Sequence, residues 1–400
     1  MDKEFSDALD RLLAFIQRSG WKGYDPYDAL NSLPLLKLPN KWLRVAPTVF
    51  FRLSPLNLRR MFLVKKGINP KAMGLLLSAY SLCHHMGAVP NLDKAGRIFH
   101  WLCRNASPGY SGLGWGYNFP WQSRDRLLAG GIPTIVNTSF VGHGILDYYD
   151  RSGNPRALEA ARSACDFILK DLNIRETDEG ICFSYSPVES HLVHNANALG
   201  ASLLARVSSY TREAELAEWA KRSFDFTIHH QRENGLWAYS IYPDTGHVRT
   251  QTDWHQGFIM DSLMWFIPCA GPSEEKARKA LEAGAAFYKT QFTGEGMGYW
   301  RLPKKWPADI HNQAQGIITF AKLEEFFPGS LPTARRIARW TMDNLWNQKK
   351  GYFYYQKWPL YTNRIAYFRW AQAWMFLALA TLLAHSSPSP ASQKAPSQTP

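Results

Sequence analysis

The sequence predicts an all-α protein that folds as one closed (α/α)6 toroid, and three observations support this. A Gly- and aromatic-rich loop, a short polar cluster and an apolar helical stretch recur five times. Aligned on small residues, the copies are 56, 57, 59 and 57 residues apart, which fits a helical hairpin with one long loop. No stretch alternates with a period of two for long enough to suggest a sheet. The residues used for the alignment are Gly144, Gly200, Gly257, Gly316 and Ala373.

The predicted outer and inner helices differ in composition. Ala157–Leu172 and Glu213–His229 are amphipathic with polar faces, as expected of outer helices. Ile317–Phe320 and Trp374–Leu383 are nearly all apolar, as expected of inner helices that are buried on every side.

An earlier helix pair, Lys71–Met86 and Asp93–Arg104, brings the number of hairpins to six. Closing the ring removes the exposed ends that an open array of repeats must cap. We therefore predict a toroid over residues 71–385, with residues 1–70 as a lead-in packed on the barrel. Residues 386–400 are rich in Ser, Pro, Ala and Gln, and we expect a disordered tail there.

Three features favour a cytoplasmic protein. The longest apolar run, Ala371–Ala384, is shorter than the roughly 20 residues that span a bilayer. The N-terminus is acidic and amphipathic, unlike a secretory signal. The five cysteines are odd in number and scattered, which is typical of reduced thiols.

The formal charge of +13 is concentrated in one stretch. Nine basic residues and no acid lie between Lys37 and Lys71. Such a stretch suits phospholipid head groups, an acidic glycan or nucleic acid, or is a solvated basic face. We expect no nucleic acid partner, because no nucleic-acid-binding motif accompanies the charge. The aromatic residues interleaved with the charges are Trp42, Phe50, Phe51 and Phe62.

The membrane alternative makes a specific prediction for this stretch. Phe50 and Phe51 would insert shallowly into an anionic leaflet. The cations that would hold the protein there include Arg59, Arg60, Lys65 and Lys66.

Aromatic residues crowd each loop that leads into a predicted inner helix. Aromatic faces stack on the C–H faces of pyranose rings, so a ring of such platforms predicts an oligosaccharide cleft; core packing is the alternative for each one. We predict that the aromatic candidates named below, apart from Trp121 and Tyr185, surround one mouth of the barrel. The aromatic candidates for substrate binding are Trp115, Tyr117, Trp121, Tyr185, Trp237, Tyr239, Tyr299 and Trp300.

Polar clusters follow the aromatic loops and supply the candidate chemistry. Glycoside hydrolysis needs two carboxyl groups that face each other, whereas β-elimination or C5 epimerisation of a uronate needs a base such as His or Tyr together with positive groups. The sequence leaves both open. The catalytic candidates are Asp125, Glu189, Asp253, Asp309, His194 and His255, and the polar substrate-binding candidates are Arg124, Arg249, His311, Tyr367 and Arg369.

We expect Asp125, Asp253 and Asp309 to point into the mouth, where desolvation would raise at least one pKa. For Asp309 the alternative is N-capping of the helix that begins near His311. The pair His191 and His194 is too small a fragment to indicate a metal site, and we expect neither a metal nor a cofactor.

One further motif points to a different chemistry. Gln231 to Trp237 matches the Q-x3-G-x-W motif of triterpene cyclases, which are also α/α toroids. The sequence has neither an acidic DxDD proton donor nor an aspartate-rich diphosphate-binding cluster. A terpenoid or prenyl-chain enzyme is therefore the third reading of the chain.

Five longer segments are distinctive when taken together: Gly20–Leu30, Gly114–Arg124, Pro133–Tyr149, Thr252–Phe258 and Asp309–Phe320. They resemble bacterial six-hairpin glycosidase-like proteins associated with exopolysaccharide or capsule biosynthesis. The resemblance runs from about residue 18 to 384 and implies an (α/α)6 barrel with a role in surface-polysaccharide production.

The sequence therefore predicts a carbohydrate-active (α/α)6 protein that processes a polysaccharide or its lipid-linked precursor, in either a hydrolase-like or a uronate lyase- or epimerase-like manner. A non-catalytic glycan-binding or assembly factor that uses the same cleft is the principal alternative.

Overall fold

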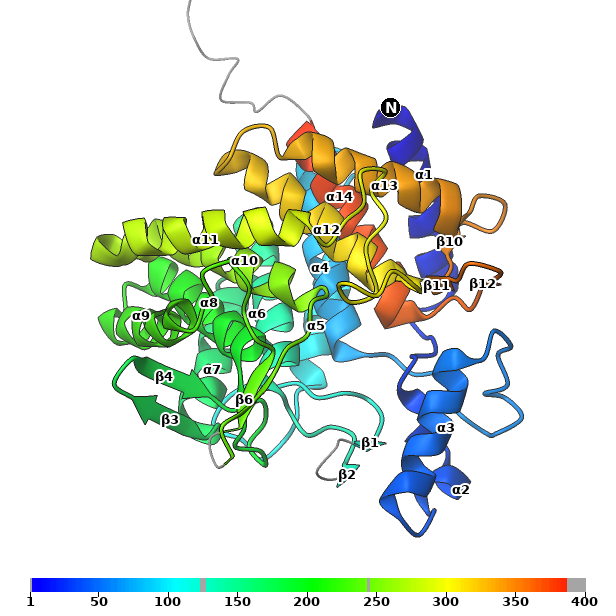
Figure 1. Ribbon diagram of the computed structural model, residues 1–400, viewed down its shortest axis with the longest axis horizontal. Helices are drawn as coiled ribbons and strands as arrows, with labels where there is room; N and C mark the ends of the chain where they lie inside the picture. The colour runs from blue at the N-terminus through cyan, green and yellow to red at the C-terminus, as the bar shows by residue number, and fades with distance from the viewer. Residues whose placement is uncertain (1, 123–126, 243–244, 387–400) are drawn as a thin grey trace, which may run out of the picture.

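The computed structural model describes residues 2–122, 127–242 and 245–386 and is largely helical (Figure 1). Contacts between its helices close them into a double ring. Each inner helix contacts the next, and the last contacts the first. The predicted all-α (α/α)6 toroid is confirmed. The inner helices are α4 (Pro70–His85), α6 (Ile135–Ser152), α8 (His194–Thr211), α10 (His255–Phe266), α12 (Ile310–Lys322) and α14 (Trp374–Ser386).

Six outer helices cover this ring, each packed on an inner helix. Their burial follows helical spacing; in α5 the buried residues are Ala95, Ile98, Phe99 and Leu102. The first helix, α1, packs on α14 as the outer partner of that inner helix, although the sequence analysis assigned it to the lead-in. The outer helices are α1 (Asp2–Arg18), α5 (Asp93–Arg104), α7 (Pro155–Asp171), α9 (Ala214–His229), α11 (Glu274–Lys289) and α13 (Leu331–Leu345).

Small residues let the inner helices approach one another closely. Gly144 of α6 lies against the backbone of Gly74 in α4, so a Cβ at Gly144 would collide with the Gly74 carbonyl. Side-chain amides then fix the loops. Gln256 of α10 accepts a hydrogen bond from the Trp237 amide at 3.1 Å and donates one to the Trp237 carbonyl at 2.8 Å. Gln372 likewise accepts from the Phe353 amide at 2.9 Å and donates to the Phe353 carbonyl at 2.8 Å. The repeated pattern in the sequence therefore has a structural role.

Strands of two to four residues occur only in the connecting loops of the described chain. All the pairings are antiparallel. They form the sheets β1–β2, β3–β4, β9–β10, β5–β6–β7 and β8–β11–β12. The strands are β1 (Trp121–Gln122), β2 (Leu127–Leu128), β3 (Ile174–Thr177), β4 (Gly180–Phe183), β5 (Leu192–Val193), β6 (Ser240–Tyr242), β7 (His247–Arg249), β8 (Ala308–Asp309), β9 (Trp346–Asn347), β10 (Tyr352–Phe353), β11 (Gln356–Lys357) and β12 (Thr362–Asn363).

Between α1 and α4 the chain leaves the ring and forms an arm, residues 33–66, that projects beside it (Figure 1). The arm contains α2 (Leu33–Leu36) and α3 (Lys41–Leu53), and follows the short helix η1 (Asp28–Asn31). The remaining short helices are η2 (Ile267–Cys269), η3 (Gly271–Ser273), η4 (Leu323–Glu325) and η5 (Phe368–Ala373), of which η5 is a π-helix that runs into α14. The predicted tail lies almost entirely outside the described residues.

Candidate active site

A pocket of 330 Å³ opens at the end of the ring where the inner helices begin. Each of the six inner helices contributes a residue of its first turn to the pocket wall. For the last inner helix, α14, this first turn is the π-helix η5 that precedes it. Helix N-termini carry partial positive charge, so six of them converging on one cavity favour an anionic ligand. The first-turn residues are Lys71, Val136, Asn195, His255, His311 and Arg369.

His255 lines the pocket and is held from behind by Asp253. Its Nδ1 lies 2.5 Å from Asp253 Oδ1. Asp253 is fully buried and also accepts from Gln251 at 2.8 Å and from Arg301 at 3.3 Å. Burial opposes the charge of this carboxyl, but His255, Arg301 and Gln251 outweigh it and hold its pKa below the usual value. An ionised carboxylate on Nδ1 orients the ring and leaves Nε2 for proton transfer.

His311 lies in an aromatic cage in the wall of the pocket. Its ring centroid is 4.4 Å from Trp370, 4.6 Å from Trp374 and 5.0 Å from Trp254. Neither ring nitrogen has a hydrogen-bond partner in the described chain. Burial, followed by the charges of Lys71 and Arg369, lowers the pKa of His311 well below its usual value. The ring is therefore neutral at neutral pH and has hydrogen-bonding capacity for a ligand.

Four guanidinium groups and one amine line the same pocket: Arg52, Arg249, Arg301, Arg369 and Lys71. Arg301 is paired with Asp253, whereas Arg52, Arg249 and Lys71 form no ion pair with the residues described. The Lys71 Nζ lies 4.1 Å from the Phe140 ring centroid. Burial, and then Arg369, lower the pKa of Lys71 well below its usual value.

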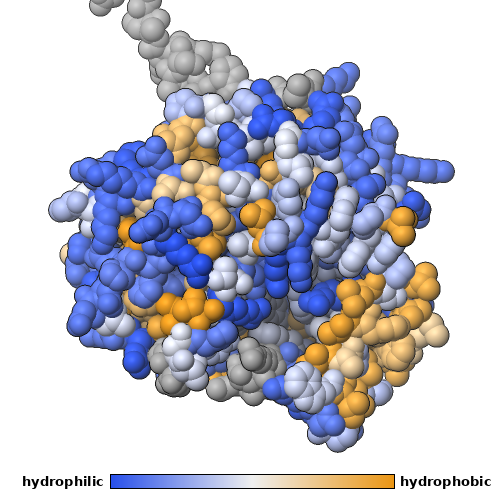
Figure 2. Space-filling model, viewed as in Figure 1, coloured by the Kyte–Doolittle hydropathy of each residue, from blue (hydrophilic) through white to orange (hydrophobic). Residues whose placement is uncertain are grey.

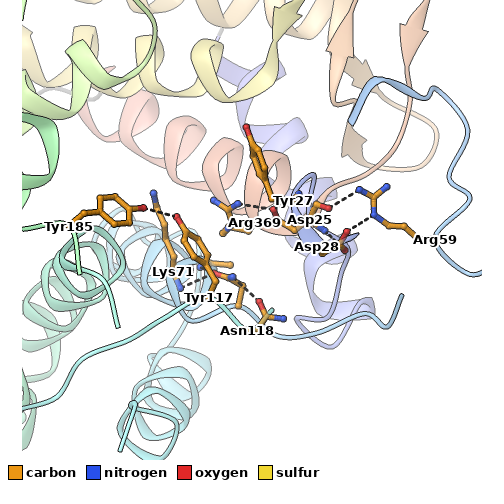
Figure 3. A network of polar contacts seen from close by, with 11 residues as sticks. Asp25, Tyr27, Asp28, Arg59, Lys71, Tyr117, Asn118, Tyr185 and Arg369 are labelled. Atoms are coloured by element: carbon orange, nitrogen blue, oxygen red, sulfur yellow. Dashed lines mark hydrogen bonds and ion pairs between the residues drawn. The ribbon is translucent and has the colours of Figure 1, made fainter. Parts of the chain in front are cut away.

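Arg369 is held in place by the N-terminal segment (Figure 3). It forms a bidentate pair with Asp25, with Nε and Nη2 at 2.6 and 2.8 Å from the carboxylate. Asp28 in turn pairs with the buried Arg59 at 2.6 Å, and Arg59 donates to the Asp25 carbonyl at 2.9 Å. This chain of contacts also places Tyr27 in the pocket wall.

Among the described carboxylates only Glu189 lines the pocket, where it accepts from Ser186 at 2.9 Å. The prediction that Asp253 and Asp309 point into the mouth is wrong for both, because each is fully buried behind its wall. Asp309 caps α12, accepting from the His311 amide and from Trp370 Nε1, both at 2.9 Å. The expected upward pKa shift is confirmed there, since burial raises the pKa of Asp309 to about 6. Asp125 lies outside the described residues.

The predicted aromatic platforms divide into two groups. Tyr117, Trp121, Tyr185 and Tyr239 line the pocket, whereas Trp115, Trp237, Tyr299 and Trp300 do not. The prediction of one aromatic ring around the mouth is therefore wrong for these four. The hydroxyls of Tyr117 and Tyr185 lie 3.3 Å apart.

Trp115 and Trp237 are core residues with a repeated structural role. Both are fully buried. Their indole nitrogens donate to Leu102 in the last turn of α5 at 3.0 Å and to Thr227 in the last turn of α9 at 2.9 Å. These bonds satisfy carbonyls that a helix end leaves unpaired. Trp237 is thus a structural element of the Gln231–Trp237 motif.

Two other candidates are buried away from the pocket. His194 stacks on Phe226 and lies near His230, and burial lowers its pKa to about 3. Tyr367 is fully buried and donates to the Phe51 carbonyl at 3.3 Å. Neither side chain lines the cavity, so the structure does not bring His194 or Tyr367 to the pocket. Arg124 lies outside the described residues.

The site candidates chosen from the sequence omitted several residues that line the pocket. Trp254 and Trp370 form its aromatic wall. Arg52 and Lys71 belong to the basic stretch Lys37–Lys71, for which the sequence left an anionic membrane, an acidic glycan and a solvated face open. The Asp25-Pro-Tyr-Asp28 turn was a usable signal, because acids flanking an aromatic before a basic stretch can pair with buried arginines.

No protein-family model matches the chain, and no curated protein sequence matches it. Its structure is similar to that of a cellobiose 2-epimerase from Bacillus thermoamylovorans, with a TM-score of 0.63, 13% identity and coverage of 80% of this chain and 88% of the other. It is also similar to that of a GH76 α-mannanase from Bacteroides thetaiotaomicron, with a TM-score of 0.60, 15% identity and coverage of 78% of this chain and 86% of the other. A possible member of the GH105 family from Salmonella enterica has a TM-score of 0.63 and 12% identity, with coverage of 96% of this chain and 95% of the other. These similarities establish the six-hairpin glycosidase fold.

Proposed function

We propose that the protein is a carbohydrate-active enzyme that binds a carboxylated sugar and removes a proton from carbon, as in uronate epimerisation or β-elimination. The observation that carries this proposal is the Asp253–His255 pair facing a pocket whose cationic side chains outnumber its one described carboxylate. The structural neighbours include a sugar epimerase and a mannanase, which supports a saccharide ligand on this fold.

The geometry supports a specific division of roles. His255 takes the C5 proton through Nε2 while Asp253 holds Nδ1. Arg52 and Arg249 bind the uronate carboxylate and stabilise the negative charge that moves onto it, and the Lys71 amine donates a hydrogen bond to it. Epimerisation returns a proton to the opposite face, whereas elimination expels the C4 substituent.

Tyrosine hydroxyls can supply the returning proton. Burial raises the pKa values of Tyr185 and Tyr239 above the ordinary tyrosine value, so both remain protonated donors at neutral pH. Tyr239 also packs against His255, with ring centroids 4.8 Å apart. This contact helps to set the orientation of the base.

The other readings fit less well. Two-carboxylate hydrolysis requires a second acid opposite Glu189, and no other described carboxylate lines the pocket. A terpenoid enzyme needs an apolar cavity, whereas this one is rich in guanidinium groups. A non-catalytic glycan-binding protein would use the same cations without needing the Asp253–His255 pair.

The resemblance to exopolysaccharide and capsule proteins extends this proposal to the cell. We propose that the substrate is a bacterial surface polysaccharide or its lipid-linked precursor, and that the protein acts in the cytoplasm. The cationic pocket supports an acidic sugar within that polymer.

The proposal is tested by incubating the protein with uronate-containing oligosaccharides in D2O. NMR would detect deuterium at C5, and ultraviolet absorbance would detect an unsaturated product of elimination. We expect one of these signals, with a loss of about 10²-fold or more in rate for His255→Gln. Calorimetric binding should persist in that variant.

Each other outcome has a distinct reading. New reducing ends with neither deuterium at C5 nor the ultraviolet absorbance of an unsaturated product would indicate hydrolysis and contradict proton abstraction. Saturable binding without any turnover would favour the glycan-binding alternative. Full activity in His255→Gln would remove this residue from the mechanism.

A further inference from the structure

The arm exposes a cluster of large apolar side chains. Ten of the fifteen large hydrophobic residues that are exposed in the described chain fall between residues 33 and 63. Figure 2 shows the resulting hydrophobic surface over this part of the molecule. The most exposed of the ten residues in the arm are Met61 at 77%, Trp42 at 72% and Leu33 at 70%. A contiguous apolar surface of this kind marks an interaction site.

The opposite side of the arm is firmly attached to the ring. Phe51 is buried, and its carbonyl accepts from Tyr367 at 3.3 Å. The Ser54 carbonyl accepts from Asn363 at 2.9 Å. Arg59 is fully buried in its ion pair with Asp28. The arm therefore has one face fixed to the toroid and one face that no described residue covers.

Cations surround the exposed apolar face. Lys37, Arg60, Lys65 and Lys66 are exposed, and Lys41 and Arg44 are partly exposed. No acidic residue lies between Lys37 and Lys71, so this charge has no local compensation in the sequence. Apolar residues with Trp at the edge of a basic surface fit the interface of an anionic bilayer, where acyl chains meet phosphate groups.

We infer that residues 33–66 dock the protein on an anionic lipid bilayer, with Trp42, Met61 and their apolar neighbours inserted into the interface. Among the described residues no helix is long and apolar enough to cross a membrane, so the contact is peripheral. A protein partner would need an acidic surface around an apolar centre, and the test below separates it from lipid.

The docking face and the pocket share one helix. Arg52 of α3 lines the pocket, while Phe50 and Leu53 beside it are exposed on the arm. Arg44 of α3 donates to Gln122 at 3.0 Å, next to Trp121 in the pocket wall. Docking through the arm therefore places the pocket beside the bilayer, where a lipid-linked sugar would be presented.

Two details differ from the membrane contact predicted from sequence. Phe51 is buried and cannot insert, while Phe50 is 49% exposed. Arg59 is fully buried in an ion pair, so reversing its charge would damage the fold rather than test the surface.

The test is flotation of the purified full chain with vesicles of phosphatidylglycerol and phosphatidylcholine, against vesicles of phosphatidylcholine alone. We expect binding to the anionic vesicles at low salt and its loss at high salt. The variant Arg60→Glu, Lys65→Glu, Lys66→Glu should weaken the partition coefficient by at least about 100-fold. The matched control is Lys349→Glu, Lys350→Glu, an exposed lysine pair outside the arm, which should bind nearly as well as the wild type.

A second variant tests insertion separately from charge. Trp42→Ser with Met61→Ser should weaken binding at least about 10-fold while the circular dichroism spectrum and melting temperature stay unchanged, since both side chains are exposed. Failure of the wild type to bind anionic vesicles at low salt would overturn the inference. Concentration-dependent self-association abolished by these serine variants, without vesicle binding, would assign the surface to a second copy instead. Neither result depends on the sugar chemistry proposed above.

Discussion

Arg369 and Asp25 are 344 residues apart in the chain and form a bidentate ion pair at the wall of the pocket, at 2.6 and 2.8 Å. Both side chains are almost completely buried, at 4% and 6% exposure. The pair joins the N-terminal segment to the start of the last inner helix. It therefore couples closure of the ring to the geometry of the site.

Asp25→Asn should lower the free energy of unfolding by about 3–5 kcal/mol, because it leaves the Arg369 charge buried without its carboxylate. The matched control is Asp147→Asn. The guanidinium of Arg206 is equally buried but would keep its second carboxylate, Asp150. Urea unfolding of both variants checks this. Equal losses would show that the Asp25 pair has no special role.

Asp253→Asn should reduce the rate of C5 proton exchange by about 10²–10⁴-fold, because His255 loses the carboxylate that orients it. Asp261→Asn is the control. Asp261 lies on the same helix, α10, but accepts from Gln315 and Thr319 away from the pocket. Single-turnover deuterium incorporation measures the effect. Similar rates in the two variants would contradict the assigned role.

Asp309→Asn should flatten the pH dependence of stability. Burial raises the native pKa of Asp309 to about 6 from 3.8, so the native state favours the protonated carboxyl. The stability it contributes is present below pH 3.8 and is lost as pH rises through about 6, by at most about 3 kcal/mol.

The measurement is denaturant unfolding of wild type and variant across this window. Asp28, whose pKa burial also raises to about 6, is present in both proteins and cancels in the difference. Parallel curves would show that Asp309 does not titrate as described.

His311→Phe should leave stability unchanged or raise it, and should abolish productive sugar binding. Both ring nitrogens are buried without a partner, which costs about 1–3 kcal/mol that an apolar ring avoids. His194→Phe is the control, because both His194 nitrogens are likewise unpartnered but this residue does not line the pocket. Thermal melts and calorimetric titration separate the two effects. Loss of sugar binding in His194→Phe as well would contradict a specific role for His311.

The His311→Phe variant should also be less sensitive to acid. The native pKa of His311 lies well below 6.5, so the unfolded chain binds a proton that the native ring refuses. Protonation of His311 in the unfolded chain therefore lowers the free energy of unfolding as pH falls below 6.5. A wild type and variant that lose stability equally on acidification would contradict this account.

The repeat register predicted the toroid because its determinants are local. Apolar periodicity decides which face of a helix is buried, and small residues such as Gly144 mark where inner helices cross. The same register could not distinguish aromatic residues that line the pocket from aromatic residues that are buried in the core. Trp115 and Tyr117 lie in one loop, two residues apart, yet Trp115 caps the end of α5 and Tyr117 lines the pocket.

The sequence by itself determined the all-helical ring, the loops that carry the site and several of its members, including His255, Tyr239, Arg249 and Arg369. Only the tertiary structure decided which of these groups face the cavity and which stand behind it. Asp253 and His255 are two residues apart, but the start of α10 turns the ring into the pocket and leaves the carboxylate buried. Direction at a helix start, and contacts such as Asp25 with Arg369 that span the whole chain, depend on packing of distant segments and have no local signature in the sequence.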